Sequence, residues 1–62
     1  MKLPEHRVLK NGKGPALYTV LNSSGKMVAN GGIVDGRLTV TFIWVGRGWT
    51  RQMALLAIQG QR

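Results

Sequence analysis

The dipeptide Asp35-Gly36 constrains the fold of this chain more than any other feature of its sequence. It stands between two runs, 27–34 and 37–45, that are rich in strand-forming residues. A two-residue turn of type I′ needs a positive φ at both central positions, which Asp and Gly tolerate better than most residues. The sequence therefore predicts an antiparallel hairpin here, and the length of the turn fixes which residues of the two strands face each other.

This register sorts the apolar side chains onto one face of the hairpin, because side chains alternate along a strand. On the second strand that face carries Leu38, Val40, Phe42 and Trp44. The residues expected opposite them are Ile33, Gly31, Ala29 and Met27. We therefore expect Phe42 and Trp44 in the core, while the Gly31-Gly32 pair favours a bulge at this point.

A second hairpin is expected just before the first. Residues 16–22 are rich in strand formers, and a three-residue loop, 23–25, places Gly25 in the left-handed conformation that such loops use. This loop predicts the pairs Leu21 with Met27, Thr19 with Ala29 and Leu17 with Gly31. A two-residue loop would instead turn Asn22 towards the apolar face, so the longer loop is preferred. Together the two hairpins form a three-stranded antiparallel meander.

The C-terminal segment is expected to cover the apolar face, because three strands alone are barely stable. Thr50 is a suitable N-cap, the following residues favour a helix, and Gly60 is expected to end it, which gives a helix over 50–59. Its expected apolar stripe consists of Met53, Leu56 and Ala57, with Leu55 and Ile58 beside it. The predicted class is α+β, a three-stranded antiparallel β-meander packed on one C-terminal α-helix. The alternative is a further strand over 49–58, which would make a small all-β barrel of four or five strands.

The first 14 residues differ from the rest of the chain in composition. They hold four of the nine basic residues, Lys2, Arg7, Lys10 and Lys13, and few apolar ones. We therefore expect a flexible basic arm at 1–14, to which Val8 and Leu9 add at most a short edge strand. A single small domain is expected at 15–62.

The charge balance points to a polyanionic partner and against an enzyme. Nine Lys and Arg residues face two carboxylates in 62 residues, a formal net charge of +7, and nucleic acid is the commonest partner of such a chain. There is no cysteine, one histidine (His6) and no carboxylate pair once Asp35 is assigned to the turn, so we expect no enzymatic activity, no metal and no cofactor. No apolar run approaches the length of a membrane span, so we expect a cytoplasmic protein without a membrane partner.

The face of the sheet opposite the helix is expected to contact the partner. Its polar side chains are of the types that hydrogen-bond to bases and phosphates. An apolar row of Val20, Val28 and Ile43 is also expected on this face. Such a row indicates a cover, which would be a DNA groove, a second copy of the chain or another protein.

This layout is similar to that of a known DNA-binding family. "PALY" (15–18) looks like the opening of the first strand in lambda-type integrases, and "SGKMVAN" (24–30) looks like their turn and second strand. "GRGWTRQMALLAIQ" (46–59) looks like their glycine–arginine junction and closing helix. Over about residues 15–60 the chain resembles the N-terminal arm-type DNA-binding domain of phage tyrosine recombinases, which is related in shape to plant AP2-type domains.

The resemblance implies that the sheet enters the major groove of double-stranded DNA while the basic arm follows phosphates. Carried over position by position, the candidates on the sheet and its junction are Tyr18, Asn22, Lys26, Asn30, Arg37, Thr39 and Arg47. The arm adds Lys10 and Lys13, and the start of the helix adds Arg51. No recombinase active site fits in the chain, so the expected role is binding only, as a regulator or recombination domain of a phage or plasmid.

Two alternatives to DNA binding stay open at this point. RNA is ranked below DNA because Tyr18 is the one aromatic residue expected on the outer face, and a platform for stacking bases needs more. The other alternative is a protein-binding effector, such as a phage inhibitor of a host enzyme, or a small self-associating protein. The row of Val20, Val28 and Ile43 would then contact the partner or form a homodimer.

Overall fold

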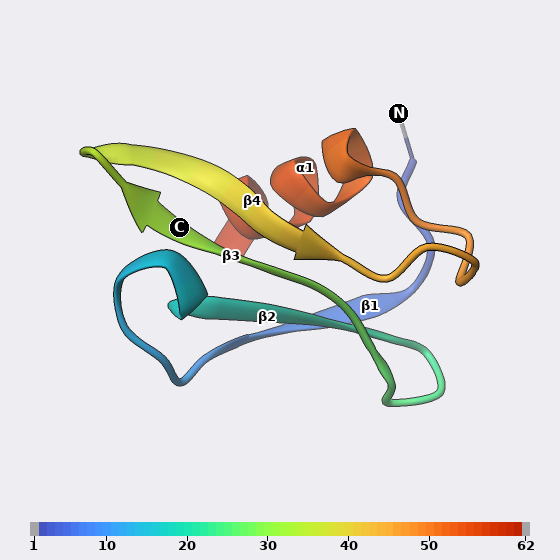
Figure 1. Ribbon diagram of the computed structural model, residues 1–62. Coiled ribbons are helices and arrows are strands. Elements are labelled where there is room, and N and C mark those ends of the chain that lie inside the picture. The colour runs from blue at the N-terminus through green and yellow to red at the C-terminus, as the bar shows by residue number, and fades with distance from the viewer. Residues whose placement is uncertain (1, 62) are drawn as a thin grey trace.

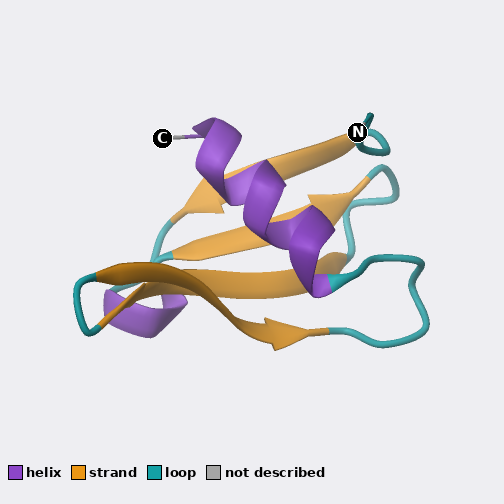
Figure 2. Ribbon diagram, turned by 90° about the horizontal axis from the view of Figure 1, so that it is seen from above, coloured by secondary structure: helices purple, strands orange, loops and turns teal. Residues whose placement is uncertain are grey.

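The computed structural model describes residues 2–61 and shows an α+β fold, in which a four-stranded antiparallel sheet carries one helix across one face (Figures 1 and 2). The strands are β1 (His6–Lys10), β2 (Tyr18–Asn22), β3 (Met27–Val34) and β4 (Arg37–Ile43). The α-helix is α1 (Arg51–Gln61), and a short 3-10 helix, η1 (Gly14–Ala16), lies between β1 and β2. The strand order β1-β2-β3-β4 makes the sheet a meander with β1 and β4 at its edges.

The sheet has four strands where the sequence led us to expect three. The additional strand, β1, comes from the segment expected to be a flexible arm, and it pairs with β2 along its whole length, with Val8 opposite Val20. The edge strand expected at Val8 and Leu9 is thus present and longer than expected. Leu3 and Val8 pack against the core, and this burial offsets the entropic cost of ordering the segment.

Both turns form as predicted from the sequence. Asp35 and Gly36 have φ values of 51° and 77°, as a type I′ turn requires. The pairs that follow this turn are the expected ones, Val34 with Arg37, Ile33 with Leu38 and Gly31 with Val40. In the other loop Gly25 has a φ of 80° and Leu21 faces Met27, again as expected.

A bulge in β4 breaks the expected register farther from the turn. The pairing is as expected up to Val40, but Asn30 then pairs with Phe42, so Thr41 is an extra residue in β4. A one-residue insertion turns every later side chain to the opposite face of the sheet. Phe42 and Trp44 are therefore 45% and 41% exposed, and the expectation that they lie in the core is wrong.

A second bulge, in β3, has the same effect on β2. The pairing slips between Leu21 and Val20, which makes Val28 the extra residue. The expected pairs of Thr19 with Ala29 and Leu17 with Gly31 are replaced by Thr19 with Asn30 and Tyr18 with Gly31. Tyr18 and Val20 consequently face α1 instead of solvent.

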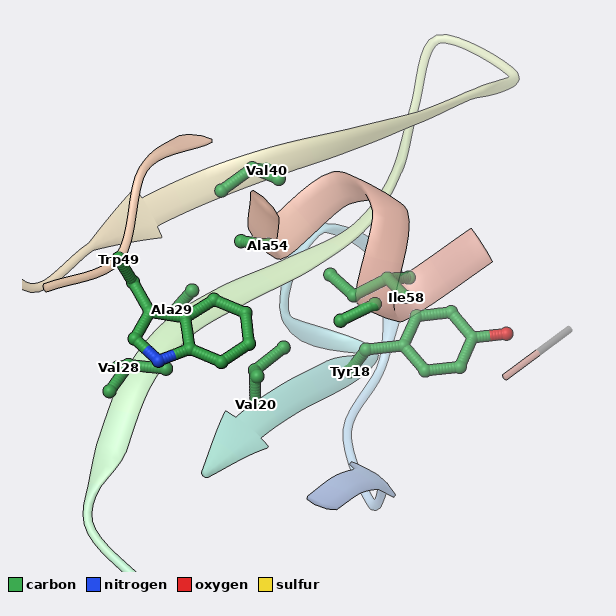
Figure 3. Packing of buried hydrophobic residues seen from close by; sticks show 9 residues of the cluster. Tyr18, Val20, Val28, Ala29, Val40, Trp49, Ala54 and Ile58 are labelled. Atoms are coloured by element: carbon green, nitrogen blue, oxygen red, sulfur yellow. The ribbon is translucent and has the colours of Figure 1, made fainter. Parts of the chain in front are cut away.

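The core lies between the sheet and α1 (Figure 3). Its buried members are Tyr18, Val20, Val28, Ala29, Val40, Trp49, Ala54, Ala57 and Ile58. The row of Val20, Val28 and Ile43, expected on the outer face, belongs to this core, because the two valines are fully buried and Ile43 packs against the cluster. What covers the row is therefore the chain's own helix.

The C-terminal segment is a helix, as predicted. The Thr50 hydroxyl accepts a hydrogen bond from the backbone N–H of Met53 at 3.2 Å and so caps the N-terminus. The helix continues past Gly60, which we expected to end it. Its buried residues are Ala54, Ala57 and Ile58. Leu56, expected in the buried stripe, is 37% exposed, because the two small alanines bring a neighbouring face of the helix close to the sheet.

Candidate nucleic-acid interface

The face of the sheet opposite α1 is called the outer face below, and it is formed by other side chains than the sequence led us to expect. The strand registers place two rows of residues across it. One row consists of Arg7, Leu21, Met27 and, just past β4, Trp44; the other consists of Leu9, Thr19, Asn30 and Phe42. The next part of the sheet is covered by η1, so these two rows are the open part of the outer face.

Two aromatic rings and an arginine form a stack on the outer face. The Phe42 and Trp44 rings lie edge to face, with centroids 5.9 Å apart and an interplanar angle of 73°. The guanidinium carbon of Arg47 lies 4.4 Å from the centroid of the Trp44 ring, a cation–π geometry. Because both rings are substantially exposed, this Phe42–Trp44–Arg47 stack offers flat apolar area next to a positive charge.

The loop after β4 holds Arg47 in place. Gly46 and Gly48 have φ values of 97° and 81°, which residues with a side chain avoid, and the arginine between them is directed back over Trp44. Arg47 Nη1 donates a hydrogen bond to the Met27 carbonyl oxygen at 2.8 Å. The guanidinium is therefore oriented before any ligand arrives, and it has further N–H donors for a partner.

Polar side chains at the middle of the outer face are held by hydrogen bonds. The Thr19 hydroxyl donates to Asn30 Oδ1 at 3.0 Å across the β2–β3 pair. The Thr41 hydroxyl, in the β4 bulge, donates to the Pro15 carbonyl oxygen at 2.8 Å and so ties η1 to the sheet. The polar groups of this face therefore have defined orientations beside the apolar stack.

Basic side chains lie at both ends of the sheet. In a meander, the starts of β1 and β3 and the ends of β2 and β4 are at the same end. That end has Arg7, Lys26 and Arg47, and the opposite end has Lys10, Lys13 and Arg37. Each end also has one carboxylate, Glu5 or Asp35, so both ends keep a positive balance that attracts a polyanion along the strands.

Of the ten predicted DNA-binding residues, all except Tyr18 are accessible to some degree. Four are exposed at the ends of the sheet: Lys10, Lys13, Lys26 and Arg37. Four are half-buried: Asn22, Asn30, Thr39 and Arg47; Arg51, at the start of α1, is exposed. Asn30 and Arg47 are brought together on the open part of the outer face, whereas Thr39 is opposite Gly32, next to η1.

Two further candidates have structural tasks that the sequence analysis did not assign to them. Tyr18 is 6% exposed and packs in the core, because the β3 bulge turns it inward. Asn22 Oδ1 accepts hydrogen bonds from the backbone N–H groups of Ser24 and Lys26, both at 3.0 Å. This pattern closes the turn between β2 and β3 and occupies the side chain that was expected to contact DNA.

The tenth candidate, Arg51, ties α1 to the edge of the sheet. Its Nη1 donates a hydrogen bond to the Val40 carbonyl oxygen. Hydrogen-bonded and non-hydrogen-bonded pairs alternate away from a two-residue hairpin turn, so the Val40 carbonyl points away from β3, towards the open edge of β4. The guanidinium therefore occupies an acceptor that a further strand would need.

Sequence reasoning missed Phe42, Trp44 and Arg7 as members of the outer face. A signal was present in residues 42–45, Phe-Ile-Trp-Val, which are apolar at four consecutive positions. Since side chains alternate, such a run places apolar groups on both faces of a sheet in any register. A large apolar pair therefore had to lie outside, and the bulge made it the aromatic pair.

The described residues give no indication of a metal site or a membrane span. They hold no group of three or more His, Cys, Asp or Glu side chains that would bind a metal ion. His6 Nδ1 lies 2.8 Å from the Pro4 carbonyl oxygen, and its ring packs edge to face on Trp49 with centroids 5.6 Å apart. Within residues 2–61, no helix combines the length and the apolar character that crossing a lipid bilayer requires.

Comparisons of the chain with protein-family models, with curated proteins and with solved structures find no match.

Proposed function

We propose that this chain is a small nucleic-acid-binding protein whose outer face binds a single strand. The observation that carries the proposal is the exposed Phe42–Trp44–Arg47 stack on a chain with a formal net charge of +7. Aromatic rings and guanidinium planes stack on the bases of single strands, and basic side chains around them attract the phosphates. Single-stranded RNA and single-stranded DNA share this chemistry.

A single strand fits this face better than the duplex DNA that the sequence favours. In a duplex the flat surfaces of the bases are stacked on one another, and proteins read base edges by hydrogen bonds instead. Two groups expected to make such bonds are occupied elsewhere, since Tyr18 is buried and Asn22 closes a turn. The reason for ranking RNA below DNA also no longer applies, because Phe42 and Trp44 lie outside.

The exposure of the stack is itself an argument for a ligand. A group of large apolar side chains that are exposed together on a surface often marks a binding site. A base stacked on an aromatic ring contributes about 1–3 kcal/mol to binding. Two rings beside a preorganised Arg47 therefore provide sequence-tolerant affinity, to which phosphate contacts at both ends of the sheet add.

The test is a fluorescence-polarisation titration with labelled RNA and DNA single strands and with a duplex of the same length. We expect tighter binding of at least one single strand than of the duplex. Trp44→Ala should weaken single-strand binding by about 5- to 150-fold, the loss expected for one stacked base. Circular dichroism should show an unchanged fold, since the ring is partly exposed.

The matched control is Val45→Ala. Val45 is the next residue, apolar and 85% exposed, but it does not take part in the stack. Its replacement should leave the affinity unchanged. Equal affinity for duplex and single strands, together with no effect of Trp44→Ala, would contradict the proposal.

A second candidate function uses the same residues to bind a protein or another copy of the chain. The observation that favours it is the exposure of three large apolar side chains near the end of β4, those of Phe42, Trp44 and Val45. The row originally expected to serve this purpose is buried under α1 and is not available. Size-exclusion chromatography with light scattering separates the candidates: a stable oligomer that dissociates on Trp44→Ala, without affinity for any oligonucleotide, favours the second.

The biological setting expected from the sequence is part of the proposal. It places the protein in the cytoplasm, as a regulator or recombination domain of a phage or plasmid. The likeness to arm-type domains of phage tyrosine recombinases concerns three strands and a helix, a layout that β2, β3, β4 and α1 also have. The first strand, β1, is additional, and it contributes Arg7 and Leu9 to the outer face.

A further inference from the structure

Asn30 has a position on the outer face that no other polar side chain within residues 2–61 shares. Its Cα partners are Thr19 on β2 and Phe42 on β4, so it lies between a hydroxyl and an exposed aromatic ring. Directly opposed side chains in an antiparallel pair have Cβ atoms about 5 Å apart. A base stacked on Phe42 would therefore bring its edge within reach of the Asn30 amide.

The orientation of this amide is set by its neighbour. Asn30 Oδ1 accepts the hydrogen bond of the Thr19 hydroxyl at 3.0 Å, so the oxygen faces β2. The nitrogen of an amide lies on the other side of the group, so Nδ2 points away from the Thr19 hydroxyl on β2, and the strand on the other side of Asn30 is β4 with Phe42. Its two N–H donors have no hydrogen bond to another residue within 2–61.

The other hydroxyl near this point is not free to take the same role. Thr41 is committed to η1 through the Pro15 carbonyl oxygen, and its second, longer contact is with the Asn30 backbone carbonyl at 3.4 Å. A ligand on the Phe42 ring therefore meets one oriented polar group, and that group is a donor.

From this geometry we infer that Asn30 is the residue that determines base preference, by donating from Nδ2 to a carbonyl oxygen of a base stacked on Phe42. The inference rests on the proposed function. Uracil and thymine have carbonyl groups on both sides of their ring N–H, whereas each ring-nitrogen acceptor next to the amino group of adenine, N1 or N7, has that amino donor beside it. Pairing with adenine uses the amide oxygen of an Asn to accept from the amino group, and Asn30 Oδ1 is engaged by the Thr19 hydroxyl, so the site prefers uracil or thymine over adenine.

The experiment compares the affinities for two homopolymers of equal length. They are oligo(U) and oligo(A) if the protein binds RNA more tightly, and oligo(dT) and oligo(dA) if it binds DNA more tightly. The ratio of the two affinities is measured for the wild type and for each variant. Base stacking within the free adenine strand affects all of these ratios equally, so it cancels when they are compared. Asn30→Asp retains an oxygen for the Thr19 hydroxyl and replaces the Nδ2 donor with an acceptor. The preference for the carbonyl-bearing homopolymer should fall about fivefold, as expected for one net hydrogen bond, or reverse.

Two further variants keep the inference falsifiable. Asn11→Asp makes the same chemical change at an exposed position in the loop before η1. It should weaken the binding of both homopolymers equally and leave the ratio of their affinities unchanged. Thr19→Val removes the hydroxyl that orients the amide while retaining the side-chain shape, so the preference should shrink while tight binding persists. This variant decides the matter if Asn30→Asp does not fold.

The outcomes separate the two proposals. If no homopolymer binds, the proposed function fails and takes the inference with it. If both bind to the wild type but the ratio is unchanged in Asn30→Asp and in Thr19→Val, the inference alone is overturned. The inference is supported if the ratio falls in Asn30→Asp and in Thr19→Val while the ratio in Asn11→Asp equals that of the wild type.

Discussion

Gly32 shows how a single residue limits the outer face. A Cβ atom at this position would lie 2.0 Å from the Gly14 carbonyl oxygen and 2.9 Å from the backbone nitrogen of Leu17. The close approach lets η1 pack flat on β3 and cover the part of the face beyond Asn30. The absence of one side chain thus confines the candidate interface to the two rows that include the aromatic stack.

We predict that Gly32→Ala lowers the free energy of unfolding by about 1–3 kcal/mol, because the added methyl group must displace η1. The matched substitution is Gly60→Ala, where no atom lies within 4 Å of the added carbon. Gly60 is in α1, so alanine there should raise stability by up to about 1 kcal/mol. Urea denaturation followed by circular dichroism measures both. Equal shifts of the two midpoints would show that η1 does not pack on the sheet as described.

At the scale of the elements, the turns and the helix could be predicted from the sequence. Which side chains lie on which face of the sheet could not. The Asp35-Gly36 turn is decided by two residues that tolerate positive φ, and the N-cap of α1 by the Thr50 hydroxyl. These are local interactions, so the local sequence is sufficient to find them.

The bulges at Val28 and Thr41 depend on contacts between distant segments. Thr41 is held by the Pro15 carbonyl oxygen, 26 positions away in the sequence, and Val28 is buried under α1. The sequence pointed to a bulge at Gly31-Gly32, and a register shift does occur beside Gly31, but the extra residue is in the partner strand. Because each bulge reverses alternation, two missed residues were enough to exchange Tyr18 for Phe42 and Trp44 on the outer face.

The buried side of α1 gives a stability test at this scale. We predict that Ile58→Ala costs about 2–5 kcal/mol, because the side chain is fully buried, whereas Leu56→Ala costs less than about 1 kcal/mol. Both substitutions end in alanine within the same helix. Chemical denaturation compares them directly. A larger loss for Leu56→Ala would mean that the stripe expected from the sequence, and not the observed one, faces the sheet.

At the scale of the whole molecule, the polyanionic partner is a prediction from composition alone, and the fold adds where the charges lie. The excess of basic residues is visible in the sequence, but their division between the two ends of the sheet depends on the strand order. The one aromatic side chain that was expected on the outer face, that of Tyr18, is buried. The charge of the candidate site could therefore be predicted, while its stacking surface required the three-dimensional arrangement.

The charge distribution predicts how binding depends on salt. If the six basic residues at the ends of the sheet each neutralise a phosphate, the logarithm of the single-strand affinity should fall with the logarithm of salt concentration with a slope of about −4. Replacing Lys10 and Lys13 with alanine should make the slope shallower by about 1.4. Titrations at several salt concentrations give both slopes. A slope near zero would rule out the end residues as phosphate contacts.

The hydrogen bond from Arg51 to the Val40 carbonyl has a consequence for how copies of this molecule can assemble. Together with the Thr41 bulge, it hinders the pairing of a further strand with the middle of β4, so β1 is the more regular edge of the sheet. A sheet that pairs readily at one edge strand alone can join one neighbouring copy through that edge. Repeated addition of copies, as in a fibril, is therefore disfavoured beyond the first pairing.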